Sequence, residues 1–530
     1  MCYLLNGNKK LMSSDELKLN TKKWFSIFCL LHVFIWTLAP TFVRSILPHD
    51  TVESIAWGMQ WQLGYDKHPP LSAWAAAAFH YLSGGHDWGL YLAAQLAVVL
   101  SFWAVWQLAK KILNPVQALI SVFLLEGIVY YTYFAVRFTP DTLQTPLWAL
   151  LGLCFYWAIQ SQELKHWLLV GFFSAAVIWT KYQSALLLIL LFLFLLFEKN
   201  ARKSFQRGGI YAAFILFLML MTPHFIWSYF HHFPEVQYAL YNKIDLLYHP
   251  PVHSFIARLM NVWIMLISQF AAMIIFILFL FTFFKTKRSE QIFASFDKKF
   301  ISWISLSPLA ATLIYGVVTG NALIARWATP YFSWLGILAM MCLKPVITRK
   351  VFARFFIIFI LLSVLLCAGR YIGLIFGPKW IGDTNPDAYY PGKEIAVKVT
   401  TLWHQKFHQK LNIIAGSHYL AAYITVYSPD HPKPYFDWNH KESAWLNDSM
   451  IKQKGTMFAW DPEEDVMHVE KNLIPQIKKR FPRAEFLGFD EFNKNVIGIK
   501  PPTVKVGMMI LAGEQSISVP LQVTKLTNNN

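Results

Sequence analysis

Residues 185–197 read ALLLILLFLFLLF and residues 273–284 read MIIFILFLFTFF, two stretches without a single charged side chain. Similar apolar runs recur along the first 375 residues, and short clusters of charge separate them. An apolar helical run of about 20 residues is long enough to cross the hydrocarbon core of a bilayer. These stretches predict a polytopic α-helical membrane protein.

The composition supports this class. Apolar residues make up 56% of the 530-residue chain and charged residues 15%, whereas a soluble domain carries about 25% charged residues. The net charge of +17 arises from Lys and Arg in short loops between the apolar runs, so we expect no nucleic-acid partner. The five cysteines have no metal-binding or redox spacing, and none follows Cys367, which excludes a disulfide framework in the C-terminal part.

We predict about eleven spans and place the N-terminus in the cytoplasm, because the basic loops then satisfy the positive-inside rule. The first run, after a basic N-terminus, is interpreted as an uncleaved span, since no convincing signal-peptide cleavage site follows it. The predicted outer segments are 45–87, 136–141, the turn at Lys181, 230–259, 320–327 and the chain after about residue 375. The predicted spans lie near residues 24–44, 88–108, 116–135, 142–160, 166–180, 183–198, 210–229, 260–284, 301–319, 328–343 and 352–374.

Two domains are predicted: a transmembrane domain over 1–375 and a small soluble α/β domain over 376–530. In the second domain we expect a helix over 419–427 and strands over 412–415, 456–460, 485–489 and 496–499. Within the first, outer segment 45–87 shows helical spacing of apolar residues over 51–63 and 71–82. We interpret these as two amphipathic helices at the outer membrane face.

The sharpest chemical signal is the HDTVE stretch at 49–53, directly after the first span. Asp50 and Glu53 are three residues apart, so both carboxylates lie on one face of a helix. One interpretation is a general base or a pair of metal ligands. The alternative is a capping box, in which Asp50 caps a helix that begins at Thr51 and Glu53 completes it. The spacing alone does not separate the two.

A second signal is GYDKHPPL at 64–71. Pro69 and Pro70 enforce a rigid, extended backbone that fixes Lys67 and His68. Lys67 is a candidate phosphate ligand, and the alternative is a lysine that snorkels at the membrane boundary.

Further charged side chains lie on the other predicted outer loops. Arg137 and Asp141 belong to RFTPD, Lys181 separates two apolar spans, and Arg326 precedes the tenth span. A lysine between spans is costly unless it faces a polar cavity or the interface. The scattered histidines show no metal-ligand spacing, so we assign no metal residues, although a divalent metal remains open.

HDTVE followed by LGYDKHPPLSAW resembles the membrane glycosyltransferases of the GT-C fold. The resemblance points to bacterial relatives of protein O-mannosyltransferases, including the aminoarabinose–lipid A transferases. TPDTLQTPLWAL, IWTKYQSALL and ARWATPYFSW match more loosely, and AGSHYLAAYITVYSPDHP looks like the opening of the family's external domain. The resemblance is strong over residues 45–185 and thin in the cytoplasmic loops and the last hundred residues.

The resemblance implies an inverting transferase that moves a sugar from a polyprenyl-phosphate donor to lipid A or another envelope glycolipid. It places the reaction at the outer face of the bacterial inner membrane, with the C-terminal domain in the periplasm. Asp50 would be the catalytic carboxylate. Glu53 is a looser match, because the family has adjacent Asp and Glu, and Asp141 corresponds approximately to a second family carboxylate. Lys67 would contact the lipid phosphate, despite the inserted His68. Lys181, Arg137 and Arg326 would add charge stabilisation.

Two alternatives remain at this point. Within the same chemistry, the acceptor is a protein rather than a glycolipid. A different class is a membrane transporter, which typically shows internal repeats and ionisable residues at mid-membrane. The sequence has no repeat, and its polar residues concentrate in the predicted outer loops.

Overall fold

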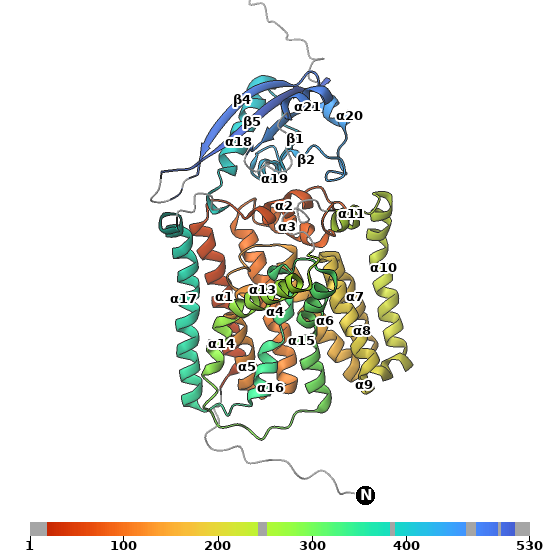
Figure 1. Ribbon diagram of the computed structural model, residues 1–530, viewed down its shortest axis with the longest axis vertical. Coiled ribbons are helices and arrows are strands. Elements are labelled where there is room, and N and C mark those ends of the chain that lie inside the picture. The colour runs from red at the N-terminus through yellow and green to blue at the C-terminus, as the bar shows by residue number, and fades with distance from the viewer. Residues whose placement is uncertain are drawn as a thin grey trace, which may run out of the picture. The chain divides into compact units, whose positions relative to one another are not determined.

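The computed structural model describes residues 19–241, 252–381, 387–462, 473–494, 496 and 500–514. The chain divides into two compact units, and both are discontinuous in sequence (Figure 1). Outer segment 45–87 groups with the C-terminal residues in one unit, and the predicted domain boundary near residue 375 stays a prediction. The first unit comprises Met1–Ala39, Tyr91–Met221 and Tyr248–Tyr371, and the second comprises Pro40–Leu90, Thr222–Leu247 and Ile372–Asn530.

The first unit is a bundle of helices around an apolar core rich in aromatic rings, including Phe102, Phe123 and Phe279. Four of its helices, α1, α4, α10 and α17, continue into the second unit. Its α-helices are α1 (Thr21–Val43), α4 (Trp88–Ile112), α5 (Pro115–Phe123), α6 (Pro140–Ser161), α7 (Leu164–Thr180), α8 (Ala185–Phe197), α9 (Lys199–Arg202), α10 (Gly208–Phe230), α13 (Phe255–Ala272), α14 (Ile274–Phe281), α15 (Ser295–Thr319), α16 (Leu335–Leu343) and α17 (Arg349–Ile381). Its 3-10 helices are η1 (Leu124–Gly127), η2 (Val129–Tyr131), η3 (Tyr182–Ser184), η4 (Lys203–Gln206) and η5 (Ala325–Phe332).

Among the described residues, seven helices are long and apolar enough to cross a membrane, or eight if the bent pair over 182–206 is one span. The chain is therefore a multi-pass membrane protein, but the predicted count of about eleven is not confirmed. Three predicted spans are interrupted. The span predicted at 116–135 turns into 3-10 helix at Leu124, and the span predicted at 260–284 breaks at Met273. The span predicted at 328–343 begins in the 3-10 helix η5 and continues as α16, which has only 9 residues. Hydropathy identifies an apolar run in the sequence, but it does not show where the helix is interrupted within that run.

The second unit contains a five-stranded mixed sheet with the order β2-β1-β3-β5-β4. Strands β2, β1 and β3 are parallel, whereas β5 pairs antiparallel with both β3 and β4. The strands are β1 (Ile413–Gly416), β2 (Lys433–Phe436), β3 (Gly455–Trp460), β4 (Glu485–Asn493) and β5 (Thr503–Ala512). The helices are α2 (His49–Gly58), α3 (Leu71–Leu82), α11 (Pro234–Tyr241), η6 (Asp387–Tyr389), α18 (Gly392–Phe407), α19 (His418–Tyr427), α20 (Asp448–Lys454) and α21 (Leu473–Arg480).

The predicted small α/β domain agrees with this sheet in class and in most elements. The strands expected over 412–415, 456–460 and 485–489 and the helix over 419–427 are present with small shifts. Strands β2 and β5 were not predicted. Of the strand expected over 496–499, only Val496 belongs to the described residues, and it is not in a strand.

Segment 45–87 contains the two expected helices, α2 and α3, but α2 is not amphipathic. All residues from Thr51 to Gly58 are buried, because α3 packs on one side of α2 and α19 on another. The approach to α3 is close: a Cβ on Gly58 would lie 2.0 Å from the carbonyl oxygen of Ala73. Protein therefore covers this helix on more than one side, and its position at the outer membrane face stays a prediction.

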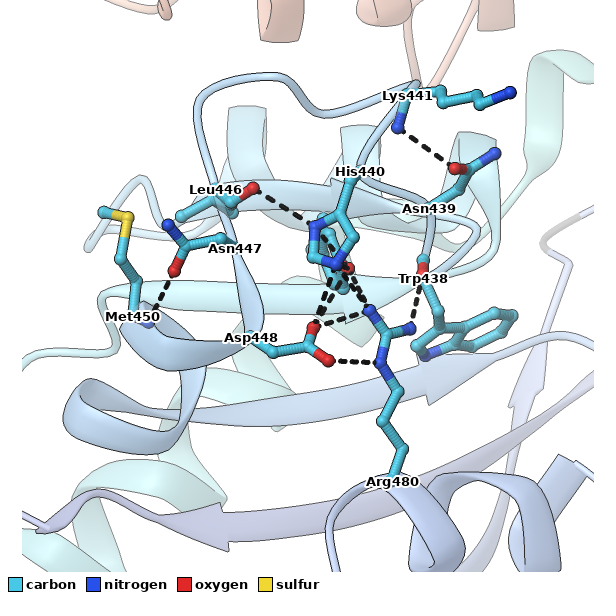
Figure 2. Close-up of polar contacts among 10 residues, drawn as sticks. Trp438, Asn439, His440, Lys441, Leu446, Asn447, Asp448, Met450 and Arg480 are labelled. Atoms are coloured by element: carbon cyan, nitrogen blue, oxygen red, sulfur yellow. Dashed lines mark hydrogen bonds and ion pairs between the residues drawn. The ribbon is translucent and has the colours of Figure 1, made fainter.

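A polar clamp in the second unit fixes the chain between β2 and α20 (Figure 2). The Arg480 guanidinium, at the end of α21, donates to both oxygens of Asp448, at 2.5 and 2.7 Å, and to the carbonyl of Trp438 at 2.7 Å. It also contacts the ring of His440 at 3.0 Å. One arginine thus holds two points of the loop that follows β2.

Candidate functional site

The second unit holds a largely buried cluster of ionisable side chains from two segments distant in sequence. The Lys67 ammonium donates to Glu53 Oε1 at 2.8 Å and lies 3.2 Å from His418 Nε2. His418 Nε2 also hydrogen-bonds the same Glu53 oxygen. The Lys67, Glu53 and His418 side chains are 20%, 8% and 11% exposed, so the charges interact with little screening by water.

Local structure explains how each member reaches this place. Glu53 is on α2, and Lys67 is in the turn between α2 and α3, which the Tyr65 N–H closes by donating to the His68 carbonyl. Pro70 caps α3, so the turn ends abruptly at the helix. His418 is the first residue of α19, two residues after β1 ends.

These contacts remove two of the interpretations that the sequence left open. Helix α2 begins at His49, its N-cap is Pro48, and no side chain caps it, so Asp50 and Glu53 form no capping box. Lys67 does not snorkel, because its ammonium is held by Glu53 beside the rings of Trp57 and Tyr238, at 5.7 and 5.9 Å.

The charges of the cluster control its protonation. Burial alone would raise the pKa of Glu53, but the positive charges of Lys67 and His418 outweigh burial and hold that pKa below its ordinary range. Burial would likewise lower the pKa of Lys67, and the negative charges of Glu53 and Asp66 raise it well above its ordinary value. Glu53 is therefore a fixed anion and a poor proton acceptor.

Three more carboxylates lie around this pair. Asp437 Oδ2 and Glu442 Oε2 lie 3.3 and 3.5 Å from His418 Nδ1, on the opposite edge of the ring from Glu53. Asp66, which precedes Lys67, is 7% exposed and interacts electrostatically with Glu442. Burial raises the pKa of Asp66 to about 7. The cluster thus contains more carboxylates than cations.

The first unit holds a second, simpler ion pair. Lys181 Nζ donates to Asp141 Oδ1 at 2.7 Å, and both side chains are nearly buried, at 13% and 12% exposed. The ammonium lies 5.3 Å from the centre of the Trp327 ring. The Gln183 amide donates to the Trp327 carbonyl and to the Tyr331 hydroxyl, which ties the Lys181 turn to η5.

The remaining predicted residues have the following positions. Asp50 is half-buried on α2, one turn before Glu53, and its carbonyl accepts from the Ser54 hydroxyl. The His68 ring packs edge-on against Trp57, 6.1 Å between centroids. In the first unit, Arg137 is half-buried with its carbonyl bound by the Thr142 hydroxyl, whereas Arg326 is exposed.

The sequence did not identify His418, Asp437, Glu442 or Asp66 as site residues. His418 and Asp437 follow directly on the ends of β1 and β2, a position where α/β proteins commonly bind ligands. That signal was usable for His418, since strand 412–415 and the helix after it were predicted. It was not usable for Asp437, because β2 was not.

Comparison with solved structures identifies the fold. Two crystal structures of ArnT from Cupriavidus metallidurans, one bound to undecaprenyl phosphate and one in the apo state, superpose with TM-scores of 0.58 and 0.57. The chain has the fold of ArnT. In both cases the identity is 12%, and the match covers 92% of this chain and 98% of the ArnT chain. The expected GT-C architecture, with a C-terminal α/β region, is confirmed.

Sequence comparison gives a partial match. The family model described as dolichyl-phosphate-mannose-protein mannosyltransferase matches residues 67–227. The match begins at Lys67 and includes Arg137, Asp141 and Lys181. No curated protein matches the chain significantly.

Proposed function

We propose that this chain is a glycosyltransferase that moves a sugar from a polyprenyl-phosphate donor to an acceptor of the bacterial envelope. One observation carries the proposal: a chain with the fold of ArnT holds a half-buried lysine, Lys67, paired with Glu53, where its match to the mannosyltransferase family begins. One of the ArnT structures is bound to undecaprenyl phosphate. Nucleotide sugars are made in the cytoplasm. An enzyme whose site faces away from the cytoplasm therefore needs a donor that the membrane delivers, and a lipid-phosphate sugar meets this need.

The contacts of Lys67 suit a phosphate ligand. An ammonium has three N–H donors, and Glu53 takes one of them. The ion pair fixes the position of the ammonium before the donor arrives, so little reorganisation is needed when charge develops on the leaving phosphate. Glu53 and His418 are then positioning residues for Lys67. His68, Arg137, Lys181 and Arg326 are further candidates for the donor phosphate, proposed from their side chains on the predicted outer loops.

Asp50 is the proposed base. Glu53 is a poor proton acceptor because its cationic neighbours lower its pKa, so we assign the base to Asp50, one turn earlier on α2, as the family resemblance implies. An acceptor oxygen attacks the anomeric carbon, and its proton passes to Asp50. The bond between that carbon and the phosphate oxygen breaks, and the electron pair leaves with the lipid phosphate. A single displacement of this kind inverts the anomeric centre. Asp141 keeps a proposed supporting role on resemblance only.

For the acceptor we propose lipid A or another envelope glycolipid, in the inner membrane with the C-terminal region in the periplasm. A protein acceptor is the second candidate, because the matching family model describes protein mannosyltransferases. The test is mass spectrometry of envelope lipids and of envelope proteins from a deletion strain and the wild type. Loss of a sugar mass from lipids supports the first acceptor, and loss from proteins supports the second. Unchanged spectra in both fractions would contradict the transferase.

A further inference from the structure

His418 and Asp437 lie at the carboxyl ends of two neighbouring parallel strands. Strand β1 ends at Gly416 and β2 ends at Phe436. From β1 the chain crosses to β2 on one side and later to β3 on the other side. Ligands of α/β sheets bind at such a change of direction, outside the carboxyl ends of the strands. The sheet therefore presents these two side chains where a ligand site is expected.

The spacing of these three side chains fits ligands around one ion. Asp437 Oδ2 and Glu442 Oε2 lie 3.3 and 3.5 Å from His418 Nδ1, and all three atoms lie within 4.8 Å of one another. A charge-assisted hydrogen bond is shorter, about 2.7–2.9 Å. Ligand atoms at about 2.1 Å from a tetrahedral metal are separated by roughly 3.4 Å.

The loop after β2 orients these oxygens. The Asn439 amide donates to Glu442 Oε1 at 3.0 Å, which leaves Oε2 directed to His418. Arg480 binds the carbonyl of Trp438, the residue next to Asp437 (Figure 2). The two carboxylates are thus held near each other by contacts outside the cluster.

The other edge of the His418 ring completes a metal-type arrangement. Its Nε2 is hydrogen-bonded to Glu53. A ligating histidine characteristically donates its second ring N–H to a carboxylate, which fixes the ring and its tautomer. Glu53 is placed for that role, with Nδ1 of His418 directed at the carboxylates.

The charge of the cluster also requires a cation. Four carboxylates, those of Glu53, Asp66, Asp437 and Glu442, interact with one lysine and one histidine. Asp66 Oδ1 is buried and has no hydrogen-bond partner among the described residues. Even with His418 protonated and Asp66 neutral, this set has one more negative charge than positive ones, and a buried charge without a partner is costly.

We propose that His418, Asp437 and Glu442 bind one divalent metal ion, with Glu53 as the carboxylate that orients His418. One imidazole and two carboxylates suit Mn²⁺ or Zn²⁺, whereas Mg²⁺ and Ca²⁺ favour oxygen-only sites. The proposal rests on these contacts and not on sugar transfer, so it stands or falls separately from the proposed function.

The test uses the full-length protein, purified in detergent and treated with a chelator. Mn²⁺ is added and the unbound ion is followed by electron paramagnetic resonance, and Zn²⁺ binding is measured by calorimetry. We expect one saturable equivalent of at least one of the two ions. Glu442→Gln and Asp437→Asn should each raise the Kd at least tenfold. Bound Mn²⁺ should show coupling to an imidazole nitrogen, and this coupling should be lost in His418→Gln.

The matched control is Glu491→Gln, an equivalent change at an exposed glutamate on β4. It should leave the Kd unchanged. Glu442 is on a loop and its side chain is 26% exposed, so its variant tests binding without loss of the fold. No saturable binding of either ion by the wild type overturns the proposal. Equal Kd values for wild type and folded Glu442→Gln overturn it as well.

Discussion

The two lysine–carboxylate pairs, Glu53–Lys67 in the second unit and Asp141–Lys181 in the first, are alike in geometry and different in surroundings. Their N–O distances are 2.8 and 2.7 Å, and no side chain of either pair is more than 20% exposed. Lys181 lies against the Trp327 ring. Glu53–Lys67 instead lies within a set of further ionisable groups: His418, Asp66, Asp437 and Glu442.

This difference separates two uses of a buried ion pair. Asp141–Lys181 is a balanced pair, in which each charge offsets the other. The Glu53–Lys67 pair belongs to a cluster that contains more carboxylates than cations, and the proposed metal ion would offset this excess. A balanced pair is expected to stabilise the fold. An unbalanced cluster is expected to respond to ligands.

The largest effect is expected from Lys67→Met. The change removes the proposed phosphate ligand and leaves Glu53 buried beside His418 alone. Loss of one charge-stabilising group lowers transfer by about 10²-fold or more, and breaking a buried pair costs about 3–5 kcal/mol. Sugar transfer and thermal unfolding in detergent measure the two effects.

The double variant Glu53→Gln with Lys67→Met is the control for stability. It should recover most of the lost stability, because Glu53 is no longer left ionised without its ammonium partner, and should stay inactive. Recovered transfer in this double variant would show that Lys67 does not act on the donor.

Lys181→Met should have the next largest effect, and its main effect should be a loss of folding stability. It leaves Asp141 buried without its ammonium, at a cost of about 3 kcal/mol. The double variant Asp141→Asn with Lys181→Met should be close to wild type in thermal unfolding, since the pair is balanced. Metal binding measured as above should be unchanged in both. An altered Kd for the metal would remove the distinction between the two pairs.

Arg480→Met should have a smaller effect, of about 2 kcal/mol at neutral pH, because hydrogen bonds from a charged group are each worth about 1.5–3 kcal/mol and the side chain is 31% exposed. Burial would raise the pKa of Asp448, but its bonds to Arg480 lower that pKa below the ordinary 3.8. The stabilisation is therefore complete above pH 3.8 and is lost as the pH falls below it. Thermal unfolding of both proteins at pH 7 and pH 3 should show the difference shrinking in acid. A constant difference would contradict the assignment to Asp448.

The smallest effect concerns His80 on α3. Burial first, and the charge of His431 second, lower the pKa of His80 below 6.5, while Asp87 opposes them. Because the unfolded chain takes up the proton more readily, His80 reduces stability as the pH falls below 6.5. His80→Leu should flatten the fall in unfolding temperature between pH 7 and pH 5. A fall of the same size in both proteins would exclude His80 as its source.

The sequence predicted the class of the fold because bilayer thickness sets the length of apolar runs. It did not predict where helices break inside those runs, because the turn at Leu124 places only Glu126 and Gly127 in an otherwise apolar run, and the break at Met273 leaves its run apolar. Burial of α2 on more than one side was missed for a related reason. Helical spacing shows which residues are apolar, whereas the cover supplied by α19 comes from the far end of the chain.

Single site residues were easier to predict than their partners. Glu53, Lys67, Asp141 and Lys181 were all selected, since a charge beside apolar runs needs a reason. The pairing of Glu53 with Lys67 and of Asp141 with Lys181 was not predicted. The turn between α2 and α3 brings the first two side chains together, and the packing of helices in the bundle brings the second two together. His418 is 365 residues from Glu53, and no periodicity connects them.

The most direct measurement of the central claim is complementation of a deletion strain with wild type or Lys67→Met, followed by mass spectrometry of envelope lipids and proteins. The two proteins must be present in the membrane at equal abundance. The account predicts that a sugar mass is lost on deletion, that wild type restores it, and that Lys67→Met does not. Full restoration by Lys67→Met would contradict the placement of the reaction at the Glu53–Lys67–His418 cluster, and no sugar difference between deletion and wild type would contradict the transferase itself.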